Sequence, residues 1–188
     1  MDLDSVLTRR PISGPEASHD GAPPPKGSGR LHRARAAVVA ALPGTGAVAA
    51  SLLALAAISA VIGEPVLIPS LAASAAVLHY TPTLHTAQPR TVVIAHLLGA
   101  GAGYALLAVA PSSPWSAALA GGLTFAATTL ARTPHSPACA TAVVVVLQTP
   151  APARFVPLLF GATLVLVLGG VAASRTHPVG DRYPVRWW

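Results

Sequence analysis

Two short apolar stretches of the chain each contain a serine at a position where a helix could begin. Ser70 follows a proline in the first stretch, and the second reads His135-Ser136-Pro137. Serine favours the position before a helix, and proline suits the first helical position because it needs no partner for its nitrogen. A helix start leaves free N–H groups and about half a positive charge, which attract anions. The pattern predicts a small-anion site, with His135 as an added donor, unless these residues only cap two helices.

Further polar residues lie in or beside apolar sequence, where charge is costly. His96 falls within the apolar run 91–110. An ionisable residue inside a membrane helix is a functional candidate, and its alternative is a neutral imidazole that joins two helices. Gln88 and Arg90 precede the same run. They either line an entrance or anchor the end of a helix.

Other chemistries lack the residues they need. A metal site requires several His, Cys or carboxylate ligands, and His96, His135 and Cys139 have neither suitable spacing nor a carboxylate. Glu64 is the only acid between positions 36 and 174 and sits in a turn, so no catalytic triad is indicated. No phosphate loop or dinucleotide fingerprint occurs. We expect no metal, no cofactor and no enzyme activity.

The elements that position these residues belong to a membrane protein. Charged residues make up 10% of the 188-residue chain, against about a quarter in soluble domains. Between positions 36 and 174 the strong bases are only Arg90, Arg132 and Arg154. The remaining bases lie in the two tails, as in the cytoplasmic ends of membrane proteins. The net charge of +6 therefore comes mainly from the two tails. This distribution of bases indicates multi-pass insertion in the cell membrane with both termini cytoplasmic, and not nucleic-acid binding.

The apolar sequence predicts an all-α membrane protein. We expect a Pro-rich disordered tail at 1–34, a helical membrane domain at 35–175, and a basic, aromatic tail at 176–188. The four longer segments are at 36–62, 91–110, 115–131 and 155–174, and the two short ones are at 68–80 and 137–148. A β-barrel would need alternating strands, which are absent from the pattern. Glycines such as Gly99, Gly101 and Gly103 would let helices approach closely.

The two short segments belong to a predicted internal repeat. Positions 70–77 match 136–143 in their small and apolar residues, and the connectors 87–90 and 151–154 also match after slips of alignment. Each unit reads helix, short helix, basic connector, helix. Ala-rich sequence also produces chance matches, which is the alternative. Paired short helices in two halves are the best sequence pointer to a transport site.

The number of crossings decides how the two halves are related. Six crossings make the halves inverted, with Arg90, Arg132 and both tails inside and Arg154 outside. Re-entrant short helices leave four crossings and parallel halves, with all three arginines outside. Counting positive charges favours six crossings.

The longer motifs resemble those of the HPP family of integral membrane proteins. The stretch 132–142, RTPHSPACATA, is similar to the family's T-x-HPPAGATA. The AQPR sequence at 87–90, followed by His96 early in a helix, resembles the family's AQPRN and GH motifs. Ser136 replaces the first Pro, Cys139 a Gly, Thr91 an Asn and Ala95 a Gly, so the chain looks like a divergent member.

The resemblance implies a helical membrane protein, usually described with four spans, which conflicts with the six segments counted above. Plant plastid and cyanobacterial members are implicated in nitrite transport. Carried over by motif position, the resemblance places nine residues near a substrate path, namely Ser70, Ser74, Gln88, Arg90, His96, His135, Ser136, Pro137 and Thr141.

The leading hypothesis is a transporter or channel for a small anion such as nitrite, with its site at the starts of the two short helices. The alternative is a membrane scaffold or accessory subunit whose basic tails contact partners or anionic lipid. The expected partners are membrane lipid and the small anionic substrate. A homo-oligomer is left open.

Overall fold

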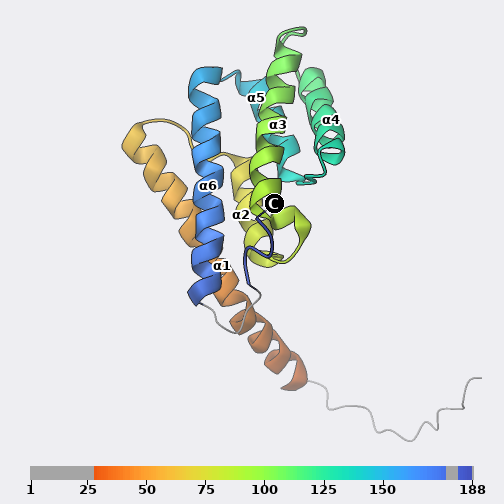
Figure 1. Cartoon of the computed structure of the whole chain (residues 1–188). Helices are drawn as coiled ribbons and strands as arrows, with labels where there is room; N and C mark the ends of the chain where they lie inside the picture. The colour runs from red at the N-terminus through yellow and green to blue at the C-terminus, as the bar shows by residue number, and fades with distance from the viewer. Residues whose placement is uncertain (1–27, 177–181, 188) are drawn as a thin grey trace, which may run out of the picture. The chain divides into compact units, whose positions relative to one another are not determined.

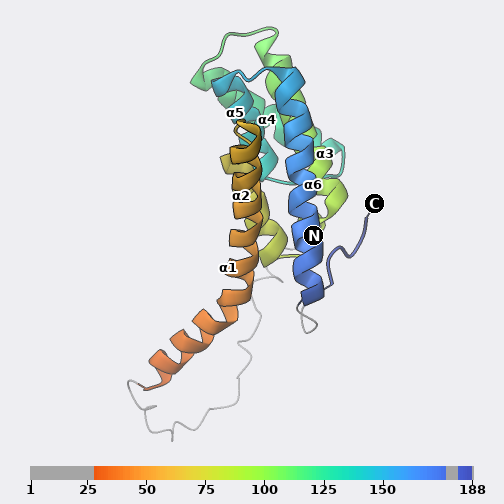
Figure 2. The same ribbon diagram turned by 90° about the vertical axis from the view of Figure 1, so that its left-hand side faces the viewer.

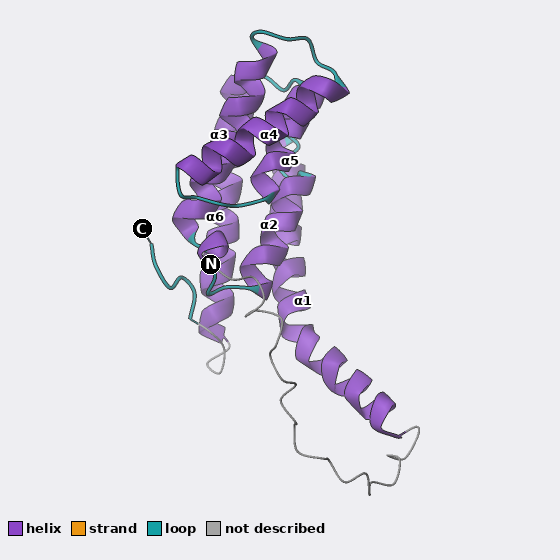
Figure 3. Ribbon diagram, turned by 90° about the vertical axis from the view of Figure 1, so that its right-hand side faces the viewer, coloured by secondary structure: helices purple, strands orange, loops and turns teal. Residues whose placement is uncertain are grey.

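The computed structural model describes residues 28–176 and 182–187. Figure 1 shows helices throughout, and Figure 3 shows no strand in the described part of the chain. The six α-helices are α1 (Ser28–Ile62), α2 (Pro69–Tyr80), α3 (Pro89–Leu107), α4 (Pro114–Leu130), α5 (Pro137–Gln148) and α6 (Pro152–Thr176). A 3-10 turn, η2 (His85–Ala87), links α2 to α3. The predicted all-helical class and the count of six helical segments are confirmed.

The chain divides into two compact units, residues 1–37 and 38–188. In the first unit the described part is helical from Ser28, and its side chains from Gly29 to Ala37 are exposed. The helix therefore begins earlier than the expected boundary at 35. The rest of the predicted tail, 1–27, lies outside the described residues. The polar contacts between helices α2, α3 and α5 lie within the second unit.

Proline marks the helix starts of this fold. Five of the six helices have a proline as their first residue, where the missing N–H costs nothing. Ser113 before α4 behaves as a capping residue, because its Oγ accepts from Ser116 N at 3.1 Å. The expected caps of the short helices are wrong. Ile68 precedes α2 without a side-chain cap, and Ser136 occupies the position before α5 with no capping bond from its side chain.

Helices α3 and α5 pack closely against each other at two glycines of α3. A Cβ added at Gly99 of α3 would collide with the carbonyl oxygen of Ala138, and one at Gly103 would lie 2.8 Å from Val145 Cβ. Nothing lies within 4 Å of a Cβ at Gly101. Two of the three glycines expected to allow close packing therefore do so, and the backbone of α5 rests directly on α3.

The two short helices lie at different levels of the bundle. Figures 1 and 2 show α5 toward the end where α3 turns into α4, and α2 farther toward the opposite end. Each has 12 residues, or about 18 Å, and so is shorter than the roughly 30 Å of hydrocarbon in a bilayer. A non-helical stretch precedes each of them, at 63–68 and 131–136.

In the described part of the chain, three helices are long and apolar enough to cross a membrane. They are the Gly29–Ile62 part of α1, the helix α3 and the helix α6. The segment expected as the fourth long span, α4, has 17 residues and is not among them. The division into four long and two short segments, and the internal repeat, stay predictions.

A buried cluster of histidine, serine and threonine

Five of the nine predicted site residues meet in the interior of the bundle. Ser70 and Ser74 come from α2, His96 from α3, His135 from the stretch before α5, and Thr141 from α5. Each is at most 2% exposed. We call these five residues the histidine cluster. Because buried polar groups are costly unless they are hydrogen-bonded, their pairing is the main feature of the site.

Ser74 is the centre of the cluster. Its Oγ lies 2.8 Å from His96 Nε2 and 2.8 Å from His135 Nε2. The same oxygen donates to the Ser70 carbonyl at 2.9 Å, the usual back-bond of a helical serine. The two imidazole rings meet edge to face, with centroids 5.3 Å apart. One hydroxyl thus bridges two histidines from different parts of the chain.

The outer nitrogens of the two rings have their own partners. His96 Nδ1 lies 2.7 Å from Thr141 Oγ1, and Thr141 Oγ1 donates to Ser70 Oγ at 2.9 Å. His135 Nδ1 donates to the Thr86 carbonyl oxygen at 2.8 Å. A continuous line of short contacts therefore runs from Ser70 on α2 to the carbonyl of Thr86 on η2.

Helix periodicity and close packing explain why these side chains meet. Ser70 and Ser74 are four residues apart and share one face of α2. On α3, His96 is three residues from Gly99, and on α5 Thr141 is three residues from Ala138. The contact of Gly99 with the Ala138 carbonyl brings the two backbones close enough for His96 to reach Thr141.

A small cavity reaches the cluster at His135. It has a volume of about 160 Å³, which holds a small ion and a few water molecules. Its walls come from η2, from α4 and from the start of α5. The lining residues are Thr86, Phe125, Thr128, Thr129, Pro134, His135, Ser136 and Cys139. The lining contains hydroxyl groups and no carboxylate, which suits an anion better than a cation.

The backbone amides at the helix starts are mostly occupied. Ala138 N donates to the His135 carbonyl at 3.0 Å, and Cys139 N donates to the Ser136 carbonyl at 3.1 Å. In α2 the amides of Leu71 and Ala72 both donate to the Ile68 carbonyl. The expectation of free N–H groups at these starts is therefore wrong at these four positions, because tight turns satisfy them locally. Side-chain hydroxyls and imidazoles are further donors near these helix starts.

The other four predicted residues lie outside the cluster. Ser136 is exposed and lines the cavity, and Pro137 is the buried first residue of α5. Arg90 is exposed. Gln88 is buried, and its amide donates to the carbonyls of Pro82 and Leu84. Its Oε1 accepts from the amides of Val185 and Arg186, so Gln88 anchors the C-terminal segment in this structure.

Sequence reasoning missed three features near the site. It did not identify Thr86, whose carbonyl orients His135, and a carbonyl acceptor leaves no sequence signal. It did not single out Thr133, which is fully buried and whose hydroxyl has no partner among the described residues. The place of Thr133 two residues before His135, inside the motif, was the available signal. Tyr183 was also missed: burial raises the pKa of its hydroxyl well above the usual range, and that hydroxyl has no partner among the residues described.

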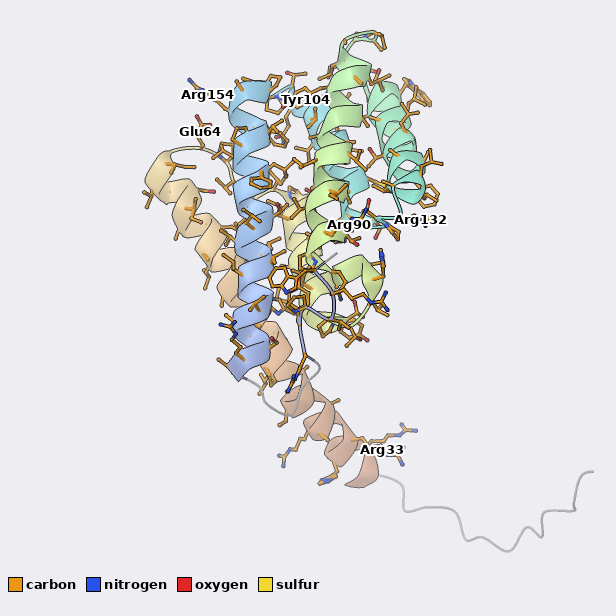
Figure 4. The ribbon with its side chains drawn as sticks, viewed as in Figure 1. Arg33, Glu64, Arg90, Tyr104, Arg132 and Arg154 are labelled. Atoms are coloured by element: carbon orange, nitrogen blue, oxygen red, sulfur yellow. The ribbon has the colours of Figure 1, made fainter. Side chains whose placement is uncertain are left out.

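None of the charged side chains in the described part of the chain forms a hydrogen bond or ion pair with the cluster. Arg154 Nη1 donates to Glu64 Oε1 at 3.2 Å, and Figure 4 shows this pair near the same end of the bundle as Tyr104, with Arg90 and Arg132 farther along. No group of three or more His, Cys, Asp or Glu side chains that could hold a metal ion is found in the described residues.

A family model described as "HPP, transmembrane region" matches residues 32–184, which is most of the chain. The chain belongs to the HPP transmembrane family. No curated protein and no solved structure matches it. In this HPP protein the residues at the His-Pro-Pro position have different locations: His135 is in the cluster, Ser136 faces the cavity, and Pro137 starts α5. The substitution of Ser136 for the first proline adds a hydroxyl to the cavity wall.

Proposed function

We propose that this HPP protein is a transporter or channel for a small anion, with nitrite as the candidate substrate. One observation carries the proposal: a buried cluster of hydroxyl and imidazole groups adjoins a small cavity that has no acidic lining residue. Hydroxyl and imidazole N–H groups donate hydrogen bonds to an anion, and ionisable groups at such depth mark ion paths.

The arrangement of the short helices supports transport. Ser70, in the first turn of α2, reaches Thr141 on α5, while Ser74 reaches His135 just before α5 begins. The starts of α2 and α5 therefore run past each other in opposite directions around the cluster. Discontinuous helices whose N-terminal ends meet at mid-membrane form the substrate sites of many transporters.

The charged residues support six crossings with both termini inside. Arg154, the one base that this topology places outside, is paired with Glu64. Arg90 and Arg132 lie farther along the bundle than that pair, about half-way down it in Figure 4. In this topology Arg90 and Arg132 are on the cytoplasmic side, and the charge of Arg154 on the outer side is neutralised by Glu64. Both placements fit the preference of positively charged loops for the cytoplasm.

The direct test is nitrite flux in proteoliposomes that contain the full chain. Empty vesicles at the same pH are the baseline, because nitrous acid leaks through bare lipid. We expect protein-dependent nitrite entry that is lost in the double variant His135→Ala, Ser136→Ala. Ser51 and His79 form a second Ser–His pair, at 3.1 Å between α1 and α2, outside the cluster. The Ser51→Ala, His79→Ala variant is therefore the matched control and should keep the flux.

A scaffold or accessory role is the second candidate, and one observation favours it. The described part of the first unit is a helix whose basic side chains, including Arg30, Arg33 and Arg35, are exposed and available to anionic lipid or a partner. This role predicts that deletion of residues 1–34 abolishes function in cells. The transport proposal predicts that the same deletion leaves nitrite flux nearly unchanged.

A further inference from the structure

The hydrogen bonds around Ser74 require more protons than one hydroxyl supplies. Ser74 Oγ faces two imidazole Nε2 atoms at 2.8 Å. A serine hydroxyl has a single proton. Ser74 Oγ gives that proton to the Ser70 carbonyl at 2.9 Å, so complete pairing requires both Nε2 atoms to carry protons and donate to Ser74.

The outer partners decide where the ring protons are. His135 Nδ1 must carry a proton, because the Thr86 carbonyl can only accept. When its Nε2 also donates to Ser74, His135 carries two protons and is an imidazolium. His96 stays neutral when the bond between Thr141 and Ser70 is reversed, so that Ser70 donates to Thr141 and Thr141 donates to His96 Nδ1. Complete pairing around Ser74 then requires one proton more than two neutral rings carry.

One added proton completes the network: His135, protonated on both nitrogens, and His96 both donate to Ser74, which keeps its bond to the Ser70 carbonyl. Without that proton, Ser74 must turn its hydroxyl from the Ser70 carbonyl toward His135 Nε2, and the bond to the carbonyl is lost. His135 also lines the cavity, so a proton can reach this ring from there. Histidines in such surroundings serve as proton relays in membrane transport proteins.

The protonated cluster lacks a balancing negative charge in the described part of the chain. The titratable neighbours of His135 are His96 on α3 and the thiol of Cys139, which lines the same cavity. Helices α2 and α4 and the turn η2 present hydroxyl, carbonyl and apolar groups to it. Glu64 is already paired with Arg154, and Arg90 and Arg132 are exposed. An anion in the cavity beside His135 is the available counter-charge.

We propose that the histidine cluster binds one proton and that the protein carries its anion together with that proton. The inference rests on the proposed anion transport. The empty site and the site loaded with both ions are neutral, whereas either ion alone leaves a net charge at a depth where charge is costly. Each ion therefore raises the affinity for the other, and the coupling is reciprocal.

The transport test compares how pH and membrane potential affect nitrite flux in proteoliposomes of the full chain. We expect protein-dependent flux, after subtraction of empty vesicles, to rise by about tenfold per pH unit of external acidification while the cluster is mostly unprotonated, since one proton enters with each anion. A potential imposed with valinomycin and potassium should leave that flux unchanged. His135→Gln should abolish the pH dependence, and His79→Gln, the control, should keep it. Protein-dependent flux that follows the potential and ignores pH would overturn proton coupling and leave anion transport standing.

A second measurement tests the proton site without transport. Solid-state ¹⁵N NMR of the histidine-labelled chain in lipid reports whether each imidazole is neutral or charged, and the His96→Gln and His135→Gln variants assign the signals. We expect addition of nitrite to convert the His135 ring to the imidazolium form, and Ser74→Ala to reduce that conversion. If both rings stay neutral with and without nitrite between about pH 5 and pH 8, the proton site is refuted. If instead no flux is seen while the imidazolium forms with nitrite, the transport proposal fails and the proton site stands.

Discussion

Replacement of Gly99 by alanine tests whether the contact between α3 and α5 holds the histidine cluster together. The added methyl group would point into the carbonyl oxygen of Ala138, which is backbone and cannot move without shifting the start of α5. Thr124 Cγ2 also lies 3.4 Å from that position. His135 precedes the same helix start, so a displaced α5 moves His135 and Thr141 away from Ser74 and His96.

The change in the free energy of unfolding caused by Gly99→Ala follows from two opposing effects. Overpacking a tight contact costs about 1–3 kcal/mol, and a backbone obstacle places Gly99→Ala near the upper end. Replacing a helical glycine by alanine stabilises the helix by up to about 1 kcal/mol, a value measured in water. The net destabilisation should be about 2 kcal/mol. Gly101→Ala meets no atom within 4 Å and should be neutral or stabilised by up to about 1 kcal/mol.

The assay is reversible unfolding of both variants in mixed micelles, followed by circular dichroism, with nitrite flux measured in parallel. The two variants should differ by about 3 kcal/mol, or roughly 100-fold in the unfolding equilibrium. Flux should fall strongly in Gly99→Ala and persist in Gly101→Ala. Equal stabilities, or an unchanged flux in Gly99→Ala, would refute the reasoning that this contact positions the cluster.

Three further variants test separate parts of the structure. Gln88→Leu should release the C-terminal segment, because the two amides of Val185 and Arg186 lose their acceptor, and limited proteolysis should then cut that segment faster than in Arg90→Ala, the exposed control. Tyr183→Phe should be neutral or stabilising by up to about 1 kcal/mol in thermal unfolding, since the lost hydroxyl is buried without a partner among the described residues; a loss above about 1 kcal/mol would reveal a missed partner. Glu64→Gln should change stability by less than about 1 kcal/mol, because its partner Arg154 is 77% exposed, and a larger loss would mean that this pair is shielded from water.

The sequence predicted the elements of this fold better than the roles of their end residues. Proline and the apolar runs indicated six helical segments because both act locally, through backbone geometry and through length. The capping role of Ser70 was wrong for a tertiary reason. A serine near a helix start can cap the helix or turn inward, and the Thr141 hydroxyl on another helix makes the inward contact here.

The candidate site was predicted as a set of residues but not as a network. Apolar surroundings singled out His96, and the motif positions added Ser74 and Thr141, which the structure brings together with Ser70 and His135. The contacts between their side chains join residues 22 to 71 positions apart in sequence, so no local pattern could pair them. Gln88 shows the same limit, because its partners in the C-terminal segment are 97 and 98 positions away.

The measurement that tests the central claim most directly is nitrite entry into proteoliposomes with the wild-type chain, the His135→Ala, Ser136→Ala variant and empty vesicles at one pH. Anion transport through the cavity beside His135 predicts wild-type flux well above empty vesicles and variant flux equal to them, with circular dichroism showing both proteins folded. Wild-type flux no greater than that of empty vesicles would contradict the transport account. Equal flux in the folded wild type and variant would contradict the assignment of the site.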